Sequence, residues 1–150
     1  MRKVGTMSVG AAPWLVWALL SAIFAALTAI FAKVGVDGVD PDVATLFRTI
    51  VIAVVLAALL LTTGKLGGIG AVGPRTWTFL VLSGLATGAS WLCYFRALRV
   101  GDAARVAPVD KLSVVLVAVL GATLLGENLS ARGWIGVALI GVGAVCVALG

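Results

Sequence analysis

Four charged side chains lie inside long apolar stretches of the sequence: Arg48, Arg96, Asp110 and Lys111. A charge within an apolar segment is costly unless it is paired, hydrated or close to the end of that segment. Such groups therefore either form a structural ion pair, for instance Asp110 with Arg48 or Arg96, or line a polar site that binds a ligand. The sequence leaves both alternatives open.

A second polar pattern follows the segment before residue 98. Ser83, Thr87, Ser90 and Tyr94 are spaced at four, three and four residues, which places them on one face of a helix, and Trp91 flanks the same face. A polar stripe with aromatic side chains suits a small polar or amphiphilic solute. It suits hydrogen bonding between helices equally well.

Catalytic and metal chemistry have little support. The sequence contains no histidine, and Cys93 and Cys146 both lie in apolar segments without a CxxC spacing. Neither a zinc site nor a Ser-His-Asp triad is available, so we expect no enzyme activity, no metal and no cofactor. The GxGxxG spelling at 68–73 lacks a preceding strand and is followed by Pro74, which indicates a loop and not a dinucleotide site.

The composition indicates a membrane protein. Hydrophobic residues make up 62% of the 150 residues and charged residues 11%, against roughly 45–50% and 25% in a typical soluble domain. The net charge of +5 comes from basic residues scattered singly, without the stripe that nucleic-acid binding requires. We expect lipid as the surrounding solvent, no nucleic-acid partner, and a location in the inner or plasma membrane.

Five apolar segments are long enough to cross a bilayer, which takes about 20 residues each. They lie near 13–32, 43–63, 76–98, 106–125 and 133–149, after an N-terminal segment at 1–12. Lipid satisfies no backbone hydrogen bond, so the segments must be helices, and short loops make neighbours antiparallel. The sequence predicts an all-α integral membrane protein with five transmembrane helices.

This arrangement brings the end of the third span to the same membrane face as the starts of the second and fourth. The four charged residues are therefore expected around one vestibule, with Asp110 and Lys111 just inside the fourth span. Pro108 has no N–H to donate to the carbonyl of Ala104, which predicts a kinked or loosened first part of that span. Asp40, before Pro41, and Ser130 are predicted N-caps.

Several stretches resemble, in order, the second half of an EamA domain: YFRALRVGD at 94–102, VAPVDKLS at 106–113, LLGENLS at 124–130 and GWIGVALIGVG at 133–143. Arg48 is similar to an arginine that such repeats often carry in their second span. The resemblance implies a drug/metabolite transporter built from a five-helix repeat, which normally occurs twice in opposite orientations. The chain is most similar to short, single-repeat members. It lacks the first-helix acid of small multidrug resistance proteins, which counts against their proton exchange.

The distribution of basic residues bears on how one repeat would act. Five lie on the N-terminal face and six on the opposite face, so the positive-inside rule sets no orientation. The first group is Arg2, Lys3, Lys65, Arg75 and Arg132, and the second is Lys33, Arg48, Arg96, Arg99, Arg105 and Lys111. A balanced chain inserts both ways, and an antiparallel pair would rebuild an inverted repeat. A start at Met7 leaves three against six, which favours an external N-terminus and a separate partner.

Together these patterns predict a carrier of small metabolites or drugs that works by alternating access, as a homodimer or with a paired five-helix protein. Ser83, Thr87, Trp91 and Tyr94 are expected to contact the solute, while Arg48, Arg96, Asp110 and Lys111 set the electrostatic field. The excess of basic groups favours anionic or zwitterionic solutes. The alternative is a non-transporting membrane subunit that stabilises or regulates a larger complex, and it predicts no helix-lined cavity.

Overall fold

The computed structural model describes residues 13–150, and in that range it contains α-helices, one short 3-10 helix and no strand. The elements are α1 (Pro13–Gly35), α2 (Pro41–Thr62), η1 (Lys65–Ala71), α3 (Pro74–Val100), α4 (Ala103–Asp110), α5 (Ser113–Leu124) and α6 (Ala131–Leu149). The N-terminal segment 1–12, which includes Arg2, Lys3 and Met7, lies outside the described residues.

Within residues 13–150, five helical stretches are long and apolar enough to span a membrane, and the prediction of an all-α protein with five transmembrane helices is confirmed. They are Trp14–Gly35, Pro41–Thr62, Pro74–Val100, Ala103–Leu124, which combines α4 and α5, and Ala131–Leu149. Large apolar side chains cover the outside: Trp17 is 73% exposed and Leu85 66%. Such a surface is stable in contact with lipid and would be strongly unfavourable in water.

Two side chains begin helices in the way the sequence predicts. The Asp40 carboxylate accepts hydrogen bonds from the backbone N–H groups of Asp42 and Val43 at 2.9 and 3.2 Å, with Pro41 as the first helical residue. The Ser130 hydroxyl accepts from the N–H of Gly133 at 3.2 Å. These bonds satisfy N–H groups that the first turn of a helix leaves without a carbonyl partner.

Replacing the second of these caps gives a small and specific effect. The Ser130→Ala variant is expected to lose about 1 kcal/mol of unfolding free energy because one helix N–H loses its acceptor. Thermal or denaturant unfolding in detergent measures the change. Ser113→Ala is the matched control, since Ser113 begins α5 without capping it. Equal losses in the two variants would contradict a capping role for Ser130.

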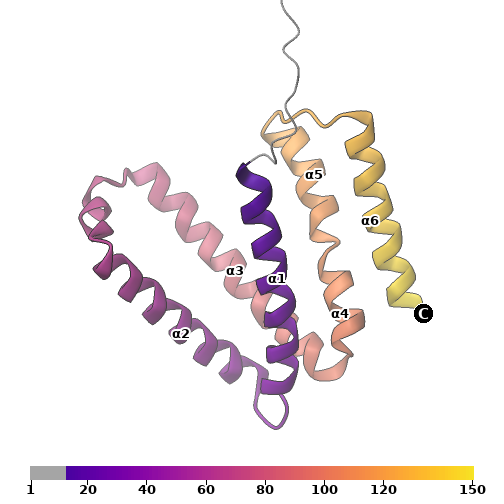
Figure 1. Ribbon diagram of the computed structural model, residues 1–150, viewed down its shortest axis with the longest axis horizontal. Coiled ribbons are helices and arrows are strands. Elements are labelled where there is room, and N and C mark those ends of the chain that lie inside the picture. The colour runs from indigo at the N-terminus through magenta and orange to yellow at the C-terminus, as the bar shows by residue number, and fades with distance from the viewer. Residues whose placement is uncertain (1–12) are drawn as a thin grey trace, which may run out of the picture.

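The helices meet closely at one end of the molecule, which we call the converging end. There α1 finishes at Gly35, α2 begins at Pro41, α3 finishes at Val100 and α4 begins at Ala103. Figure 1 shows α1, α4, α5 and α6 in a group, while the α2–α3 hairpin leans away from them towards η1. The buried core accordingly lies near the converging end, where Ala32, Val36, Phe95 and Leu98 pack together.

Three basic side chains fasten this end by hydrogen bonds. Lys33 on α1 donates to the backbone carbonyls of Leu98 and Gly101, at 2.7 and 2.9 Å, at the C-terminus of α3. Arg99 donates to the carbonyl of Val39 in the α1–α2 loop. Arg96 forms a two-pronged ion pair with Asp42 on α2, described below. We call these three sets of contacts the end clamp, and they tie α1, the α1–α2 loop and α2 to α3.

Candidate functional site

The fourth membrane span is broken near its middle. Pro108 lies inside α4, which ends at Asp110, and α5 begins only at Ser113 (Figure 1). Across the break, Lys111 N–H donates to the carbonyls of Ala107 and Pro108 at 3.3 and 3.1 Å, and the next residue, Leu112, bonds three residues back. Proline removes one donor and clashes with the preceding turn, so it weakens the helix at this point, and the regular α-helical bonding is lost in the turn that follows it.

The break changes the expected depth of two charged residues. The span starts at Ala103 and not near residue 106, so Asp110 and Lys111 are the eighth and ninth of its 22 residues. Along this helical stretch they lie about 10–12 Å from its start, further along than the sequence predicted. The sequence predicted that Pro108 would kink or loosen the first part of this span. In the structure α4 is regular up to Asp110, and the break comes after the proline.

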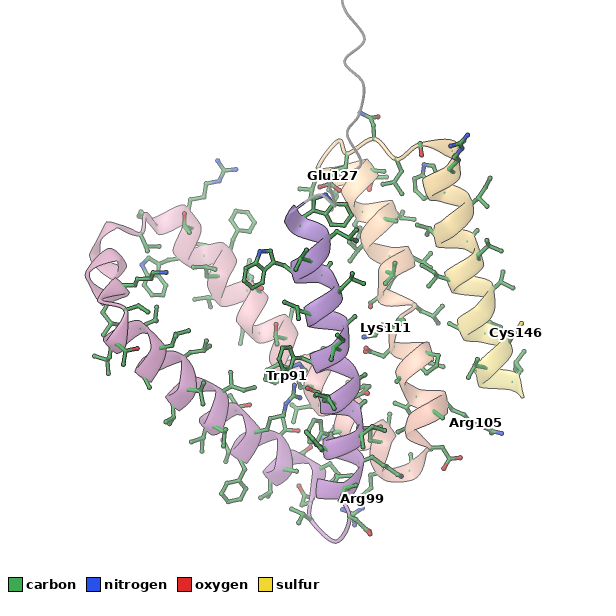
Figure 2. The ribbon with its side chains drawn as sticks, viewed as in Figure 1. Trp91, Arg99, Arg105, Lys111, Glu127 and Cys146 are labelled. Atoms are coloured by element: carbon green, nitrogen blue, oxygen red, sulfur yellow. The ribbon has the colours of Figure 1, made fainter. Side chains whose placement is uncertain are left out.

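A polar cavity of about 180 Å³ lies beside this break. Its walls come from α1, α2, α3 and the end of α4, and Figure 2 shows Trp91 on α3 and Lys111 at the break, both towards mid-length of the bundle. Five of the eight predicted site residues line it. The complete lining is Ala25, Thr28, Arg48, Ser90, Trp91, Tyr94, Asp110 and Lys111.

Arg48 reaches into this cavity from the eighth residue of α2. Its guanidinium carbon lies 4.0 Å from the centre of the Trp91 ring and 5.4 Å from that of Phe95. Each such cation–π contact stabilises by about 0.5–2 kcal/mol, which offsets part of the cost of an arginine at this depth. Within residues 13–150 neither ion pair involves Arg48.

Asp110 is paired, but not with either expected partner. Its carboxylate lies 3.1 Å from the Nζ of the adjacent Lys111, an arrangement that places both side chains at the helix break. The sequence suggested Arg48 or Arg96 instead. The lining of the polar cavity thus carries two cations, Arg48 and Lys111, and one carboxylate, which leaves one net positive charge.

Arg96 lies outside the polar cavity, contrary to the expected convergence of four charges. Its Nε and Nη2 donate to the two carboxylate oxygens of Asp42 at 3.0 and 2.7 Å, and both side chains are well exposed, at 61% and 47%. Two residues along a helix correspond to a rotation of about 200°, so Arg96 points away from the face that carries Tyr94. Sequence reasoning missed Asp42, although it opens the second span at the same membrane face as Arg96.

Ser83 and Thr87 also lie outside the polar cavity. They continue the stripe of Trp91 and Tyr94 along α3 towards η1, and both are exposed. The Thr87 hydroxyl donates to the carbonyl of Ser83 at 2.8 Å. Thr87 is one turn, about 6 Å, from Trp91, and Ser83 is two turns away, so a cavity of this size does not reach them.

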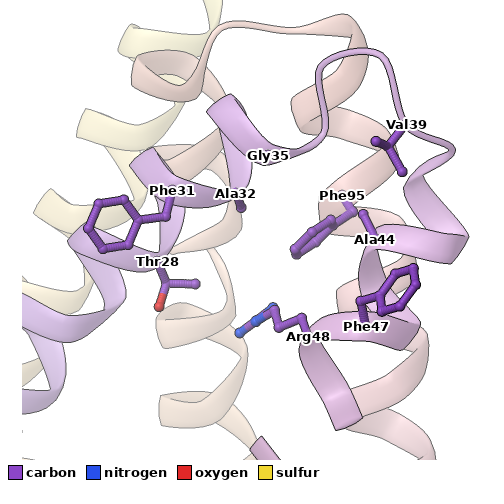
Figure 3. Close-up of a pocket in the computed structure, with 9 residues that line it drawn as sticks. All are labelled: Thr28, Phe31, Ala32, Gly35, Val39, Ala44, Phe47, Arg48 and Phe95. Carbon is purple, nitrogen blue, oxygen red and sulfur yellow. The ribbon is translucent and has the colours of Figure 1, made fainter. Parts of the chain in front are cut away.

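A larger and mostly apolar cavity adjoins the first and shares two of its residues, Thr28 and Arg48. Its volume is about 480 Å³. Figure 3 shows the Arg48 side chain extending from α2 towards Thr28 on α1, with the Phe95 ring beside the same space and Phe31 and Phe47 at its outer sides. The lining consists of Thr28, Phe31, Ala32, Gly35, Val39, Ala44, Phe47, Arg48 and Phe95. The sequence contains no pattern that would have singled out this cavity, because its members come from three separate helices and a loop.

The part of the chain that the structure describes holds no cluster of three or more histidine, cysteine, aspartate or glutamate residues that would bind a metal ion. The fold and site together define a multi-pass membrane protein with a polar cavity at a broken helix.

Comparisons with known proteins agree with this class. Residues 12–149 match the EamA-like transporter family. The chain is also 60% identical, over 136 residues, to a Sinorhizobium protein named as an uncharacterized transporter in the cobO 3' region; the match covers 91% of this chain and 96% of the relative. No solved structure matches the chain. The chain belongs to the EamA-like transporter family, and it is a membrane transporter.

Proposed function

We propose that this transporter carries small anionic or zwitterionic solutes by alternating access, as an antiparallel pair of five-helix units. The observation that carries the proposal is the polar cavity at the break between α4 and α5. Secondary transporters commonly bind their solutes near mid-membrane, beside interrupted helices whose free backbone groups and charges face the site. Arg48, Asp110 and Lys111 supply charge here, and Trp91 and Tyr94 supply aromatic surface.

The uneven packing of the helices supports a carrier with one closed side. The end clamp, made by Lys33, Arg99 and the Arg96–Asp42 ion pair, closes the converging end. Towards η1 the α2–α3 hairpin leans away from α1, α5 and α6 (Figure 1). In an alternating-access cycle the clamp would have to break as the other side closes, so we assign Arg96 to gating and not to solute contact.

The exposed surface of α3 supports a second copy as the partner. Gly84 and Gly88 form a small-residue pair on the surface of α3. No other part of the chain that the structure describes covers this pair, because a Cβ added at either glycine would have no neighbouring atom within 4 Å. Such pairs allow close approach of two membrane helices. Ser83 and Thr87 lie on the same part of α3, and in a pair they would face the path of the solute.

The alternative, a non-transporting subunit, predicts no helix-lined cavity, and the two adjoining cavities described above count against it.

Cysteine crosslinking tests the antiparallel pair directly. The background for this test is Cys93→Ala with Cys146→Ala, which removes the native thiols. The middle residue of α3 is Thr87, so a Gly88→Cys thiol would face the same thiol of the second copy in an antiparallel pair. Gly84→Cys is three residues from the middle, so in an antiparallel pair the two copies of that residue are offset by roughly 9 Å, beyond disulfide reach. We expect Gly88→Cys to crosslink to itself and Gly84→Cys not to do so. Crosslinking of both variants indicates a parallel pair, and crosslinking of neither removes the α3 interface.

Transport itself is tested in proteoliposomes with three radiolabelled probes: benzenesulfonate as an anion, leucine as a zwitterion and tetraethylammonium as a cation. We expect protein-dependent uptake of one of the first two. Uptake of the cation alone, or of none of the three by a strictly monomeric protein, would overturn the proposal.

A further inference from the structure

We infer that Arg48 and Thr28 bind the oxyanion head of a small amphipathic carboxylate, and that the apolar cavity receives its hydrocarbon body. This assignment rests on the proposed function and specifies its substrate class. It comes from three independent features: an arginine with unused donors, a threonine hydroxyl with no partner in its own helix, and a cavity whose wall changes from polar to apolar at these two residues.

The first feature is the environment of Arg48. A guanidinium has five N–H donors arranged in a planar fork that matches a carboxylate. The faces of Trp91 and Phe95 satisfy its positive charge in part, but an aromatic face does not satisfy the fork of donors. In the described part of the chain, Lys33 and Arg96 also tie two helices together, and both use their donors on a carbonyl or a carboxylate. Arg48 is held in place with its hydrogen-bonding edge available.

The second feature is the Thr28 hydroxyl. Seven other threonines in the described residues donate their hydroxyl to a carbonyl three or four residues earlier in the chain. Thr28 makes no such bond, although it is half-buried in α1 and lines both cavities. Figure 3 shows it opposite the tip of Arg48. Its hydroxyl is thus free to donate to the same oxyanion.

The third feature is the pair of cavities. The polar cavity, at about 180 Å³, has room for a head group and little more. The apolar cavity, at about 480 Å³, falls within the roughly 300–1,000 Å³ range of small-molecule sites. Phe95 is buried beside it, whereas Phe31 and Phe47, at 68% and 65% exposure, form its open rim. A solute with its carboxylate at Arg48 would place an aromatic or branched aliphatic group there.

A membrane phospholipid fits this site poorly. Arg48 lies seven residues, or about 10 Å, along α2 from Pro41, whereas a lipid head group remains at the membrane surface. A lipid would have to move its phosphate about 10 Å along α2 from the start of the helix to reach the guanidinium. A short, water-soluble carboxylate that enters through the protein does not face that cost.

The test measures binding to the purified protein in detergent by calorimetry, so it does not depend on transport. The probes are 3-phenylpropionate, its neutral analogue 3-phenylpropanol, its cationic analogue 3-phenylpropylamine, and acetate, which has the head without the body. Palmitate represents the lipid source of the same head group. We expect 3-phenylpropionate to bind roughly tenfold more tightly than the alcohol, the amine and acetate, since one charge-assisted bidentate contact or a buried ring is sufficient for that factor. It should also bind more tightly than palmitate, whose chain is too long for a cavity of about 480 Å³.

Three variants assign the two halves of the site. Arg48→Gln should remove the preference for the carboxylate over the alcohol, and Arg48→Lys, which keeps the charge but not the fork, should retain part of it. Gly35→Leu fills the apolar cavity at a position where an added Cβ meets nothing within 4 Å, so it should weaken 3-phenylpropionate and leave acetate unchanged.

Tight binding of palmitate without 3-phenylpropionate, or a carboxylate preference that survives Arg48→Gln, would overturn the inference. A protein that transports leucine but shows neither preference would keep the proposed function and lose this substrate class.

Discussion

Replacing Pro108 by alanine is expected to stabilise the protein while removing most of its transport. The alanine N–H can donate to the carbonyl of Ala104, and α4 can then continue into α5 as one regular helix. Proline inside a helix costs about 3 kcal/mol, part of which the break at Lys111 already relieves, so we expect a gain of about 1–3 kcal/mol in unfolding free energy. Thermal unfolding in detergent measures this change.

Transport should move in the opposite direction. A continuous helix would rotate Asp110 and Lys111 out of the polar cavity. The solute would then lose at least one contact to a charged side chain, which corresponds to a fall in uptake of roughly tenfold or more. Uptake of whichever probe the unmodified protein accumulates is the measurement. Pro74→Ala is the matched control, because Pro74 is the first residue of α3, where proline is well tolerated. A Pro108→Ala protein with unchanged uptake would show that the break is structural only.

Replacing Lys33 by methionine is expected to destabilise the converging end strongly. The Lys33 ammonium donates to two backbone carbonyls, and one of them belongs to Leu98, the most completely buried residue of the core. Methionine keeps the length of the side chain but leaves both carbonyls at the C-terminus of α3 without this donor. Hydrogen bonds to a charged group contribute about 1.5–3 kcal/mol, so we expect a loss of about 2–3 kcal/mol, measured by unfolding in detergent.

Two controls separate this contact from a general effect of removing a lysine. Lys65→Met removes an exposed charge from η1 and should change the unfolding free energy by less than about 0.5 kcal/mol. Lys33→Arg keeps a donor at the same place and should recover part of the loss. If Lys33→Met were no less stable than Lys65→Met, the bonds to α3 would contribute nothing.

The end clamp and the polar cavity occupy different layers of the same helices. Arg96 and Arg99 hold the end of α3, whereas Trp91 and Tyr94 line the cavity from about half a turn to two turns further in, and Arg96 and Tyr94 lie on different faces of the helix. A change at the clamp would therefore alter access to the site before it altered contacts within it. This arrangement suits a carrier in which the protein opens and closes around a fixed binding site.

The sequence by itself determined the membrane architecture of this protein. Lipid offers no hydrogen bonds to a backbone, so five apolar segments of about 20 residues had to become helices, and their short loops had to alternate their directions. The caps at Asp40 and Ser130 were also readable, since each depends only on a side chain and the N–H groups two or three residues later. Local chemistry was sufficient for all of these features.

Only the tertiary structure decided which charges meet. Arg48 and Arg96 are both single arginines in apolar segments, yet one faces aromatic rings beside two cavities and the other pairs with Asp42 at the surface. That difference depends on how far each helix is rotated about its axis and on where α4 breaks. Rotation and break position are set by packing between helices distant in the sequence, because each residue turns a helix face by about 100°. A shift of two residues is therefore enough to move a charge from the cavity to the outside.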